Sequence, residues 1–330
     1  MIAEGKITVY LGTEVRIESN RVSMVSQFLK GRSANEALAL FPMIYALCAH
    51  AHCAAARLAL GFGKADLRMV LAENAREHLL RILMGWRLEK QPLFPAAPIM
   101  AFVPEMAKEI EQGRENIVAS DLEDFLKTHV FGCSTADFLE MDSLKWMNDA
   151  ETGVAFFLRD LLGKGWQSLG NVQPSLLPNL PLTNIAEQMQ VPAYCDQPTW
   201  ENKCYETGPF ARQFMHQCVT KIVETYGAGL LARLMARLVE LAQIPQQMCT
   251  AKPLEMLAGL GVIETARGRL FHYAEQQDGV IKDYRILAPT EWNFHPSGVA
   301  AQALAGLAGE EARAMVSAID PCVDFELKAA

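Results

Sequence analysis

The stretch YALCAHAH at residues 45–52 places a cysteine and a histidine four positions apart, and the stretch DPCVDFELK at residues 320–328 carries another cysteine near the far end of the chain. Each stretch reads as half of a four-thiolate metal site. In each, an aromatic residue, Tyr45 or Phe325, stands where a second cysteine would complete a C-x-x-C pair. The sequence therefore predicts a site that keeps half of its sulfur ligands.

Composition indicates a large folded protein whose partners are proteins. The 330 residues are 51% hydrophobic with a formal charge of -8, so a substantial core can form. We find no basic run with interleaved aromatic residues, which argues against nucleic acid as a partner. We assign residues 1–330 to a single domain, with a proline-rich internal connection near residues 171–200.

Targeting features point to the cytoplasm. The start of the chain lacks a secretory signal, and no apolar stretch reaches the roughly 18 residues that span a bilayer. Eight scattered cysteines in so long a chain are typical of free thiols in a reducing compartment. We expect a cytoplasmic protein without a membrane partner.

Hydrophobic periodicity predicts a mainly helical chain. Residues 6–19 alternate apolar and polar side chains, which predicts a pair of strands. Residues 41–60 are rich in alanine and lack glycine, and residues 66–88 are amphipathic, so each range predicts one long helix. Ser120 and Glu123 have the spacing of a capping box and predict the start of another helix.

The second half of the chain repeats this mixture. Leucines at helical spacing over residues 228–244 predict a core helix, and residues 299–319 predict a helical segment. Residues 262–288 return to strand-like sequence, with a hairpin turn at Asp278-Gly279. The predicted fold class is α+β and mainly α-helical, with small antiparallel β-sheets near the N-terminus and around residues 262–288.

Three further motifs lie between the two half-pairs: ETGPFAR at residues 206–212, ETARGRLFH at residues 264–272 and APTEWN at residues 288–293. They are similar to E-V-G-P-L-A-R, E-A-P-R-G-x-L-x-H and V-P-T-T-W-N in the large subunit of nickel-iron hydrogenases. The half-pairs are similar to that family's C-x-x-C-x-x-x-H and D-P-C-x-x-C-x-x-H. Because the motifs keep the family's order over nearly the whole chain, the sequence resembles this family, and the resemblance implies its helical core.

The departures from the family pattern fall on functional positions. Tyr45 and Phe325 replace two thiolates, Lys328 replaces a histidine, and Ser26 stands where the active enzymes carry a proton-moving glutamate. The chain is also shorter than typical catalytic members. This pattern resembles most the hydrogenase maturation proteins called HupK or HoxV, which serve as scaffolds for building the iron part of the cofactor.

The resemblance implies the ligands of an iron fragment. In the active family four thiolates hold nickel, and two of them bridge to an iron that carries two cyanides and one carbon monoxide. Cys48 matches a bridging position and Cys322 a nickel-only position, so we expect a transient iron fragment and no nickel. Arg267 and Thr290 match the donors to the cyanides, and Pro289 joins them as a cofactor-binding residue.

Three histidines have expected roles of different strength. His52, four residues after Cys48 on the same helical face, is expected to orient that thiolate as a hydrogen-bond donor. His272 and His295 each have two interpretations, a place beside the pocket or a structural role.

Other residues keep a plain structural alternative. Tyr45 and Phe325 either exclude a second metal or fill space. Glu206 and Arg212 either serve the site or form an ion pair at the Gly208 turn. The remaining cysteines are expected to be packing thiols: Cys53, Cys133, Cys195, Cys204, Cys218 and Cys249.

The expected function is that of a non-catalytic scaffold. It would receive the iron fragment from maturation chaperones that build or deliver it, and would pass it to the hydrogenase large-subunit precursor. Two thiolates in place of four favour exchange over permanent binding. Two alternatives are a metal-free pseudo-subunit that binds hydrogenase or maturation proteins, and a redox enzyme with altered ligands.

Overall fold

The computed structural model describes residues 5–20, 24–45, 48–88, 91–92, 101–102, 104–106, 108–109, 112–173, 175–191, 193–255 and 259–329. The chain divides into two compact units. The first unit comprises residues 1–67, 174–211 and 253–330, and the second comprises residues 68–173 and 212–252. The chain thus leaves the second unit where the proline-rich stretch begins, and the assignment of the whole chain to a single domain stays a prediction.

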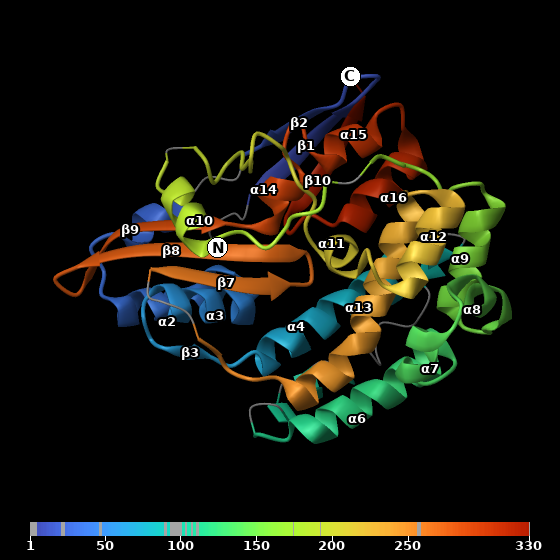
Figure 1. Ribbon diagram of the computed structural model, residues 1–330, viewed down its shortest axis with the longest axis horizontal. Helices are drawn as coiled ribbons and strands as arrows, with labels where there is room; N and C mark the ends of the chain where they lie inside the picture. Colours follow the sequence, from blue (N-terminus) through green and yellow to red (C-terminus); the bar gives the residue numbers. More distant parts are fainter. Residues whose placement is uncertain are drawn as a thin grey trace. The chain divides into compact units, whose positions relative to one another are not determined.

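The first unit combines small sheets with helices (Figure 1). Its strands are β1 (Lys6–Leu11), β2 (Arg16–Ser19), β3 (Lys64–Ala65), β6 (Leu254–Glu255), β7 (Leu260–Thr265), β8 (Gly268–Gln277), β9 (Val280–Leu287) and β10 (Asp324–Ala329). Its helices are α1 (Met24–Leu29), α2 (Ala34–Ile44), α3 (Ala49–Ala59), α10 (Leu182–Met189), α14 (Pro289–Asn293), α15 (Val299–Leu304) and α16 (Gly309–Ile319).

The antiparallel sheet β7-β8-β9 separates two hydrophobic clusters. Successive side chains of a strand point to opposite faces, so Phe271 and Tyr273 of β8 face one cluster with α10, whereas Ala274 faces the other with α2 and α3. Figure 1 shows α2 and α3 along one side of this sheet and α10 along the other. Burial on both faces makes this sheet the centre of the first unit.

The predicted hairpin at Asp278-Gly279 is confirmed. These residues join β8 to β9 and adopt φ values of 52° and 80°. Two consecutive positive φ angles match the right-handed twist of the flanking strands, which is why Asp-Gly is a strong hairpin signal.

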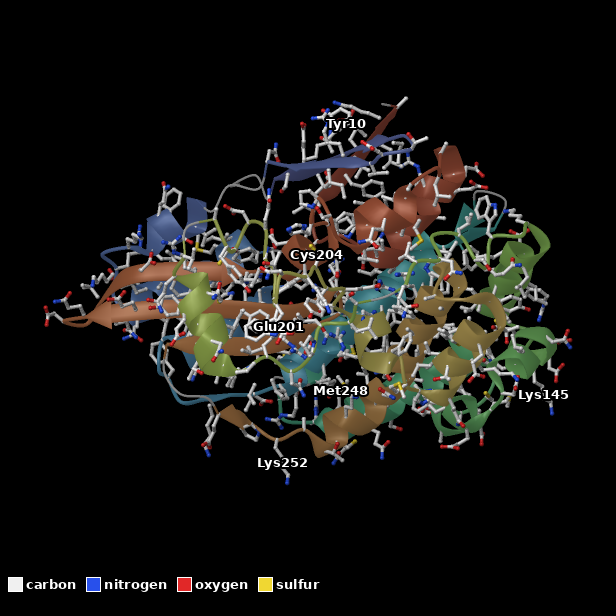
Figure 2. The ribbon with its side chains drawn as sticks, turned by 45° about the horizontal axis from the view of Figure 1, so that its top comes forward. Tyr10, Lys145, Glu201, Cys204, Met248 and Lys252 are labelled. Atoms are coloured by element: carbon white, nitrogen blue, oxygen red, sulfur yellow. The ribbon has the colours of Figure 1, made fainter. Side chains whose placement is uncertain are left out.

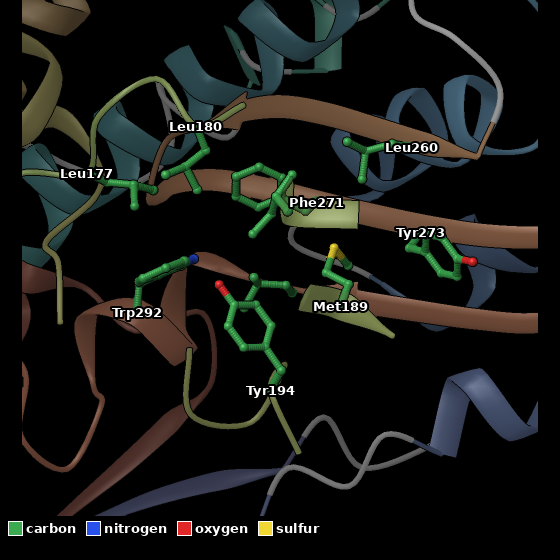
Figure 3. Packing of buried hydrophobic residues seen from close by; sticks show 10 residues of the cluster. Leu177, Leu180, Met189, Tyr194, Leu260, Phe271, Tyr273 and Trp292 are labelled. Carbon is green, nitrogen blue, oxygen red and sulfur yellow. The ribbon is translucent and has the colours of Figure 1, made fainter. Parts of the chain in front are cut away.

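Trp292 anchors α14 to the cluster on the α10 side. Its indole is fully buried and points toward Leu177, Leu180 and Phe271 (Figure 3). Pro289 begins the helix with a φ suited to the first helical position. Pro289 therefore favours the start of this short helix, and the packing of Trp292 holds the helix against the cluster.

The expected N-terminal strand pair is confirmed and is extended by an unexpected partner. β1 pairs antiparallel with β2 and parallel with β10, in the order β10-β1-β2. The register places Phe325 opposite Ile7. This parallel pairing attaches the motif near the far end of the chain to the first strand. Two parallel strands need a long connection between them, so partners that are distant in sequence are expected.

The second unit is built from helices around one long buried helix. That helix, α13 (Leu230–Thr250), contacts α4, α6, α7 and α12 and is the predicted core helix, continued beyond Pro245. The other α-helices are α4 (Arg68–Leu79), α6 (Glu115–Leu126), α7 (Thr135–Glu140), α8 (Ser143–Asp149), α9 (Gly153–Gly163) and α12 (Gln217–Tyr226). The unit also contains two π-helical segments, η1 (Leu80–Gly85) and η2 (Lys127–Phe131), and the short strands β4 (Arg87–Leu88) and β5 (Gln91–Pro92). The short helix α11 (Pro209–Gln213) crosses from the first unit into the second.

The prediction of one helix over residues 41–60 was wrong. The structure has α2, then an extended Tyr45 with φ −109° and ψ 106°, and then α3 with Cys48 as its N-cap. Pro42 lies in the last turn of α2, where it lacks a backbone N–H to continue the helix ladder. The break places the cysteine of the first half-pair at a helix N-terminus.

Other boundaries also differ from the sequence prediction. Ser120 lies inside α6, and the Glu123 carboxylate binds the backbone and hydroxyl of Thr135 instead of closing a capping box. The helical range 299–319 is interrupted between α15 and α16, and the connection at residues 171–200 contains α10. Within the part of the chain that the structure describes, no helix combines the length and apolarity needed to cross a bilayer.

Candidate functional site

The internal motifs meet within the first unit through the side chain of Asn293. The Thr207 backbone N–H donates to Asn293 Oδ1 at 2.8 Å, and Asn293 Nδ2 donates to the Arg267 carbonyl at 3.3 Å. Asn293 is buried, so both bonds form away from solvent. One amide therefore joins the three motifs that contain Thr207, Arg267 and Asn293 itself.

Two glycines allow this junction to close. A Cβ on Gly208 would lie 2.8 Å from the Arg267 carbonyl oxygen, and one on Gly268 would lie 2.5 Å from a side-chain carbon of Thr207. The φ values of 111° and 138° are also accessible mainly to glycine. The glycines of the two motifs thus let the β7–β8 turn approach the backbone before α11.

Thr290 holds Cys322 through two hydrogen bonds. The Cys322 N–H donates to Thr290 Oγ1 at 3.1 Å, and the Thr290 hydroxyl donates to Cys322 Sγ at 3.0 Å. Thr290 is buried, whereas Cys322 is partly exposed. The structure therefore brings together two predicted site residues that are 32 positions apart in sequence.

Arg267 lies beside a buried carboxylate. Its Nε is 3.5 Å from Asp320 Oδ2, and both side chains are almost fully buried. Asp320 caps the end of α16 with a φ of 65°, a left-handed conformation that is uncommon outside glycine. The positive charge expected beside the site is thus partly balanced by the residue that begins the second half-pair.

A cleft of about 490 Å³ reaches Thr290. Its lining includes Ile7 from β1, Gln27 from α1, Asp196 and Phe294. This volume is in the usual range for small-molecule sites. The cleft therefore borders the buried residue that holds Cys322.

The first half-pair begins a helix. Cys48 is the N-cap of α3 and its carbonyl accepts the first helical hydrogen bond, from the His52 N–H at 3.0 Å. The N-terminal end of a helix carries partial positive charge, which suits an anionic ligand. Sequence alone placed this cysteine in the middle of a helix, where that effect would be absent.

His52 belongs to a buried polar chain behind Cys48. Its Nδ1 lies 2.9 Å from His272 Nε2, and His272 Nδ1 lies 2.7 Å from the Tyr284 hydroxyl. His52 is 3% exposed and the other two are fully buried. Burial lowers the pKa of His272 to about 3, so its ring is neutral at physiological pH.

Tyr45 stacks directly on His52. The ring centroids are 3.5 Å apart and the planes differ by 3°. In a continuous helix, residues seven positions apart would be separated by about 10.5 Å along the axis, so the break between α2 and α3 is what permits the stack. The ring that replaces a cysteine covers one face of the histidine.

The second replaced position lies on a strand. Phe325 is half-buried on β10, with the Arg313 guanidinium 5.9 Å from its ring centroid. Lys328, which stands for a histidine, is exposed on the same strand, and its Nζ lies 5.8 Å from the centroid of the Tyr10 ring on β1. Tyr10 is labelled in Figure 2. Ser26, at the position of the proton-moving glutamate, is buried on α1.

His295 has a cysteine neighbour that the sequence did not indicate. Its Nδ1 accepts the Ser297 N–H at 3.0 Å and lies 3.2 Å from Cys204 Sγ, whose residue is labelled in Figure 2. Burial lowers the pKa of His295 and raises that of Cys204, so both are neutral. This pair connects the loop after α14 to the segment before α11.

The remaining secondary candidates have structural partners. Arg212 forms a two-pronged ion pair with Glu240, at 2.7 Å and 2.6 Å, and the pair with Glu206 stays a prediction. Burial raises the pKa of Cys195 to about 12 and that of Cys218 to about 11, in keeping with packing thiols. None of the eight cysteines, all of which lie among the described residues, forms a disulfide.

Sequence reasoning missed Asn293, Asp320 and Tyr284. Asn293 and Asp320 lie inside the motifs APTEWN and DPCVDFELK, so the sequence indicated where they are but not which residues they contact. Tyr284 could have been found from strand periodicity, because it faces the same side of the sheet as His272. Among the described residues, no group of three or more His, Cys, Asp or Glu side chains is positioned to hold a metal ion.

Comparison with known proteins agrees with these motifs. A family model described as nickel-dependent hydrogenase matches residues 212–307. The hydrogenase expression/formation protein HoxV of Cupriavidus necator is 28% identical over 98% of this chain and 95% of that protein. HupK of Azotobacter vinelandii, also a hydrogenase expression/formation protein, is 29% identical over 92% of this chain and 90% of that protein.

The chain is similar in sequence to the HoxV and HupK proteins. Solved hydrogenases share its fold: the Ni-Fe-Se hydrogenase of Desulfovibrio vulgaris Hildenborough aligns with a TM-score of 0.58 and 15% identity, over 94% of this chain and 93% of that one. That of Desulfomicrobium baculatum gives 0.53 and 14%, over 93% and 92%. The predicted mainly helical, large-subunit-like fold is confirmed.

Proposed function

We propose that this chain is a non-catalytic scaffold that assembles the iron part of the nickel-iron hydrogenase cofactor. The names of its homologues HoxV and HupK, hydrogenase expression/formation proteins, support a role in maturation. The observations that support the finer proposal are the Thr290–Cys322 contact and the ion pair of the buried Arg267 with Asp320, two residues before Cys322. The hydroxyl of Thr290 contacts the proposed sulfur ligand, and the Arg267 guanidinium contacts a residue of the same half-pair, all within the first unit.

The surviving sulfurs suit iron better than nickel. Cys48 and Cys322 would each contribute one thiolate, whereas nickel or zinc sites usually take four soft or borderline donors. A low-spin iron that already carries two cyanides and one carbon monoxide needs few protein ligands. The cargo would therefore be the iron fragment, delivered by maturation chaperones and passed to the hydrogenase large-subunit precursor.

Arg267 would meet the negative charge of the cargo. An iron(II) fragment with two cyanides is neutral, and two thiolates make it a dianion, which requires donors when buried. The guanidinium is held in place by Asp320, so it is positioned before the cargo arrives. The same carboxylate repels an anion, which weakens the hold and favours release.

Thr290 would control the hydrogen bonding of Cys322 on the side of the site that borders the cleft. Its hydroxyl has one hydrogen, which Cys322 Sγ accepts in the structure. When Cys322 binds the cargo, the Thr290 hydroxyl can keep its hydrogen bond to the sulfur or rotate to donate to a cyanide nitrogen. The cleft that reaches Thr290 offers the route by which a donor or acceptor protein approaches.

Infrared spectroscopy of protein made together with its maturation partners tests this function. We expect cyanide and carbon monoxide bands, about one iron per chain and no nickel; Cys48→Ala and Cys322→Ala should each lose the bands. Cys249→Ala is the matched control, because this exposed thiol lies in the second unit. Bands that persist in both site variants would refute the assignment, and protein without iron would favour a metal-free pseudo-subunit.

A further inference from the structure

Tyr284, His272 and His52 form a chain of hydrogen bonds whose direction can be assigned. The hydroxyl of Tyr284 is fully buried, and among the described residues His272 is its hydrogen-bond partner. A buried hydroxyl must give its hydrogen to an acceptor, or the desolvation of that group is uncompensated. The Tyr284 hydroxyl therefore donates to His272 Nδ1.

This first bond fixes the rest of the chain. A neutral imidazole has one N–H, so a His272 ring that accepts at Nδ1 carries its hydrogen on Nε2. That nitrogen lies 2.9 Å from His52 Nδ1, which must then accept. The hydrogen of His52 is consequently on Nε2. The low pKa of His272, about 3 through burial, keeps the ring neutral and the direction unchanged near pH 7.

Aromatic packing prevents His52 from turning out of this arrangement. Tyr45 covers one face of its ring with a centroid distance of 3.5 Å. The buried Phe41 ring lies 6.3 Å from His52 and 5.3 Å from His272. Rotation of the imidazole out of its plane would break the stack, and a 180° flip within the plane would break the bond to His272.

We propose that Tyr284 and His272 hold His52 as its Nε2–H form, so that His52 acts as a hydrogen-bond donor toward the site and is excluded as a metal ligand. Both ring nitrogens are committed, Nδ1 by its bond from His272 and Nε2 by its hydrogen. This positioning role rests on the proposed function, because it explains why a cysteine-histidine pair would select a preassembled iron fragment over a bare divalent metal, which readily takes imidazole.

Long-range proton-nitrogen NMR of ¹⁵N-histidine-labelled protein without cargo tests the assignment. With His52 signals identified by their loss in His52→Gln, we expect an excess of the Nε2–H form on the order of ten to one. Tyr284→Phe removes only the hydroxyl and should bring the two forms toward equal populations. Tyr273→Phe is the control, because Tyr273 neighbours His272 on β8 but belongs to the opposite cluster.

The result is decisive even if Tyr284→Phe folds poorly. A wild-type spectrum with the hydrogen of His52 on Nδ1 overturns the proposal, and so does a folded Tyr284→Phe with an unchanged ratio. The measurement needs no iron. A correct Nε2–H form together with an absence of cyanide bands in co-expressed protein would therefore defeat the scaffold function and leave the positioning role standing.

Discussion

The two cysteine half-pairs, so alike in sequence, lie in opposite kinds of structure. Cys48 begins a helix that packs on β7, in front of the buried His52 and His272. Cys322, which is partly exposed like Cys48, lies between α16 and β10 and is held by the Thr290 hydroxyl. We call α3 and the buried His52–His272 pair beneath Cys48 the platform, and we call Cys322 with the Thr290 hydroxyl the clasp.

Under the proposed function, this contrast would give transfer of the iron fragment a direction. Regions with few buried contacts open at lower free energy than packed cores. The strand after Cys322 has only exposed or half-buried residues, and the nearby cleft reaches Thr290. We therefore expect cargo to enter and leave on the Cys322 side while the Cys48 side stays in place.

The largest expected effect breaks the platform. A Cβ on Gly261 would lie 1.9 Å from the Ala55 carbonyl oxygen, so Gly261→Ala must push α3 away from β7. We expect urea unfolding to show a loss of about 3 kcal/mol or more. Gly163→Ala, at the open end of α9, is the control and should be nearly neutral. A loss below about 1 kcal/mol would show that α3 is not seated on the sheet.

Acid should weaken the platform through His272. Unfolded, this histidine takes a proton near its ordinary pKa of 6.5, but folded it resists protonation until about 3. Its contribution to stability is therefore full above pH 6.5 and falls as the pH drops toward 3, by up to about 1.4 kcal/mol per pH unit.

Urea unfolding at several pH values between 7.5 and 4.5 measures this slope. Other histidines also titrate, so the test is the difference between wild type and His272→Gln, which should be close to one proton. His129→Gln, at a less buried ring, should change the slope less. Equal slopes for wild type and His272→Gln would show that His272 does not cause the loss of stability in acid.

The clasp should respond to loss of one hydroxyl. Thr290→Val keeps a similar shape but removes both bonds to Cys322, at a cost of about 1–3 kcal/mol. Without that hydroxyl the Cys322 thiol should be alkylated faster by iodoacetamide, as followed by mass spectrometry. Thr290→Ser retains the hydroxyl and should stay close to wild type. Unchanged alkylation in the valine variant would mean that Thr290 does not restrain the thiol.

The smallest expected effect concerns the strength of the hold on cargo. Asp320→Asn removes the negative charge beside Arg267, and asparagine tolerates the same left-handed backbone. The cyanide bands should then decay roughly fivefold more slowly during transfer, a difference on the order of 1 kcal/mol. Asp324→Asn, an exposed change on β10, is the control. Faster decay in Asp320→Asn would contradict the opposing role given to this carboxylate.

Sequence motifs predicted the fold better than they predicted local structure. The glycines at 208 and 268 and the Asp278-Gly279 turn could be read from sequence because their backbone angles suit few other residues. The uninterrupted helix over residues 41–60 was wrong, because the alanine-rich composition was weighed above Pro42, which lies in the last turn of α2 before the extended Tyr45. The capping-box spacing at Ser120 was likewise overridden, since Glu123 binds Thr135 from a neighbouring helix.

The chain's own order of residues determined the family resemblance, the half-empty pattern of sulfur ligands and most helices and strands, because these depend on identity and local spacing. Only the tertiary structure decided that Thr290 clasps Cys322, that Asp320 faces Arg267 and that Tyr45 lies on His52. Such contacts join residues brought together by packing, and hydrogen bonds and ring stacking act over a few ångströms in space without regard to distance along the chain.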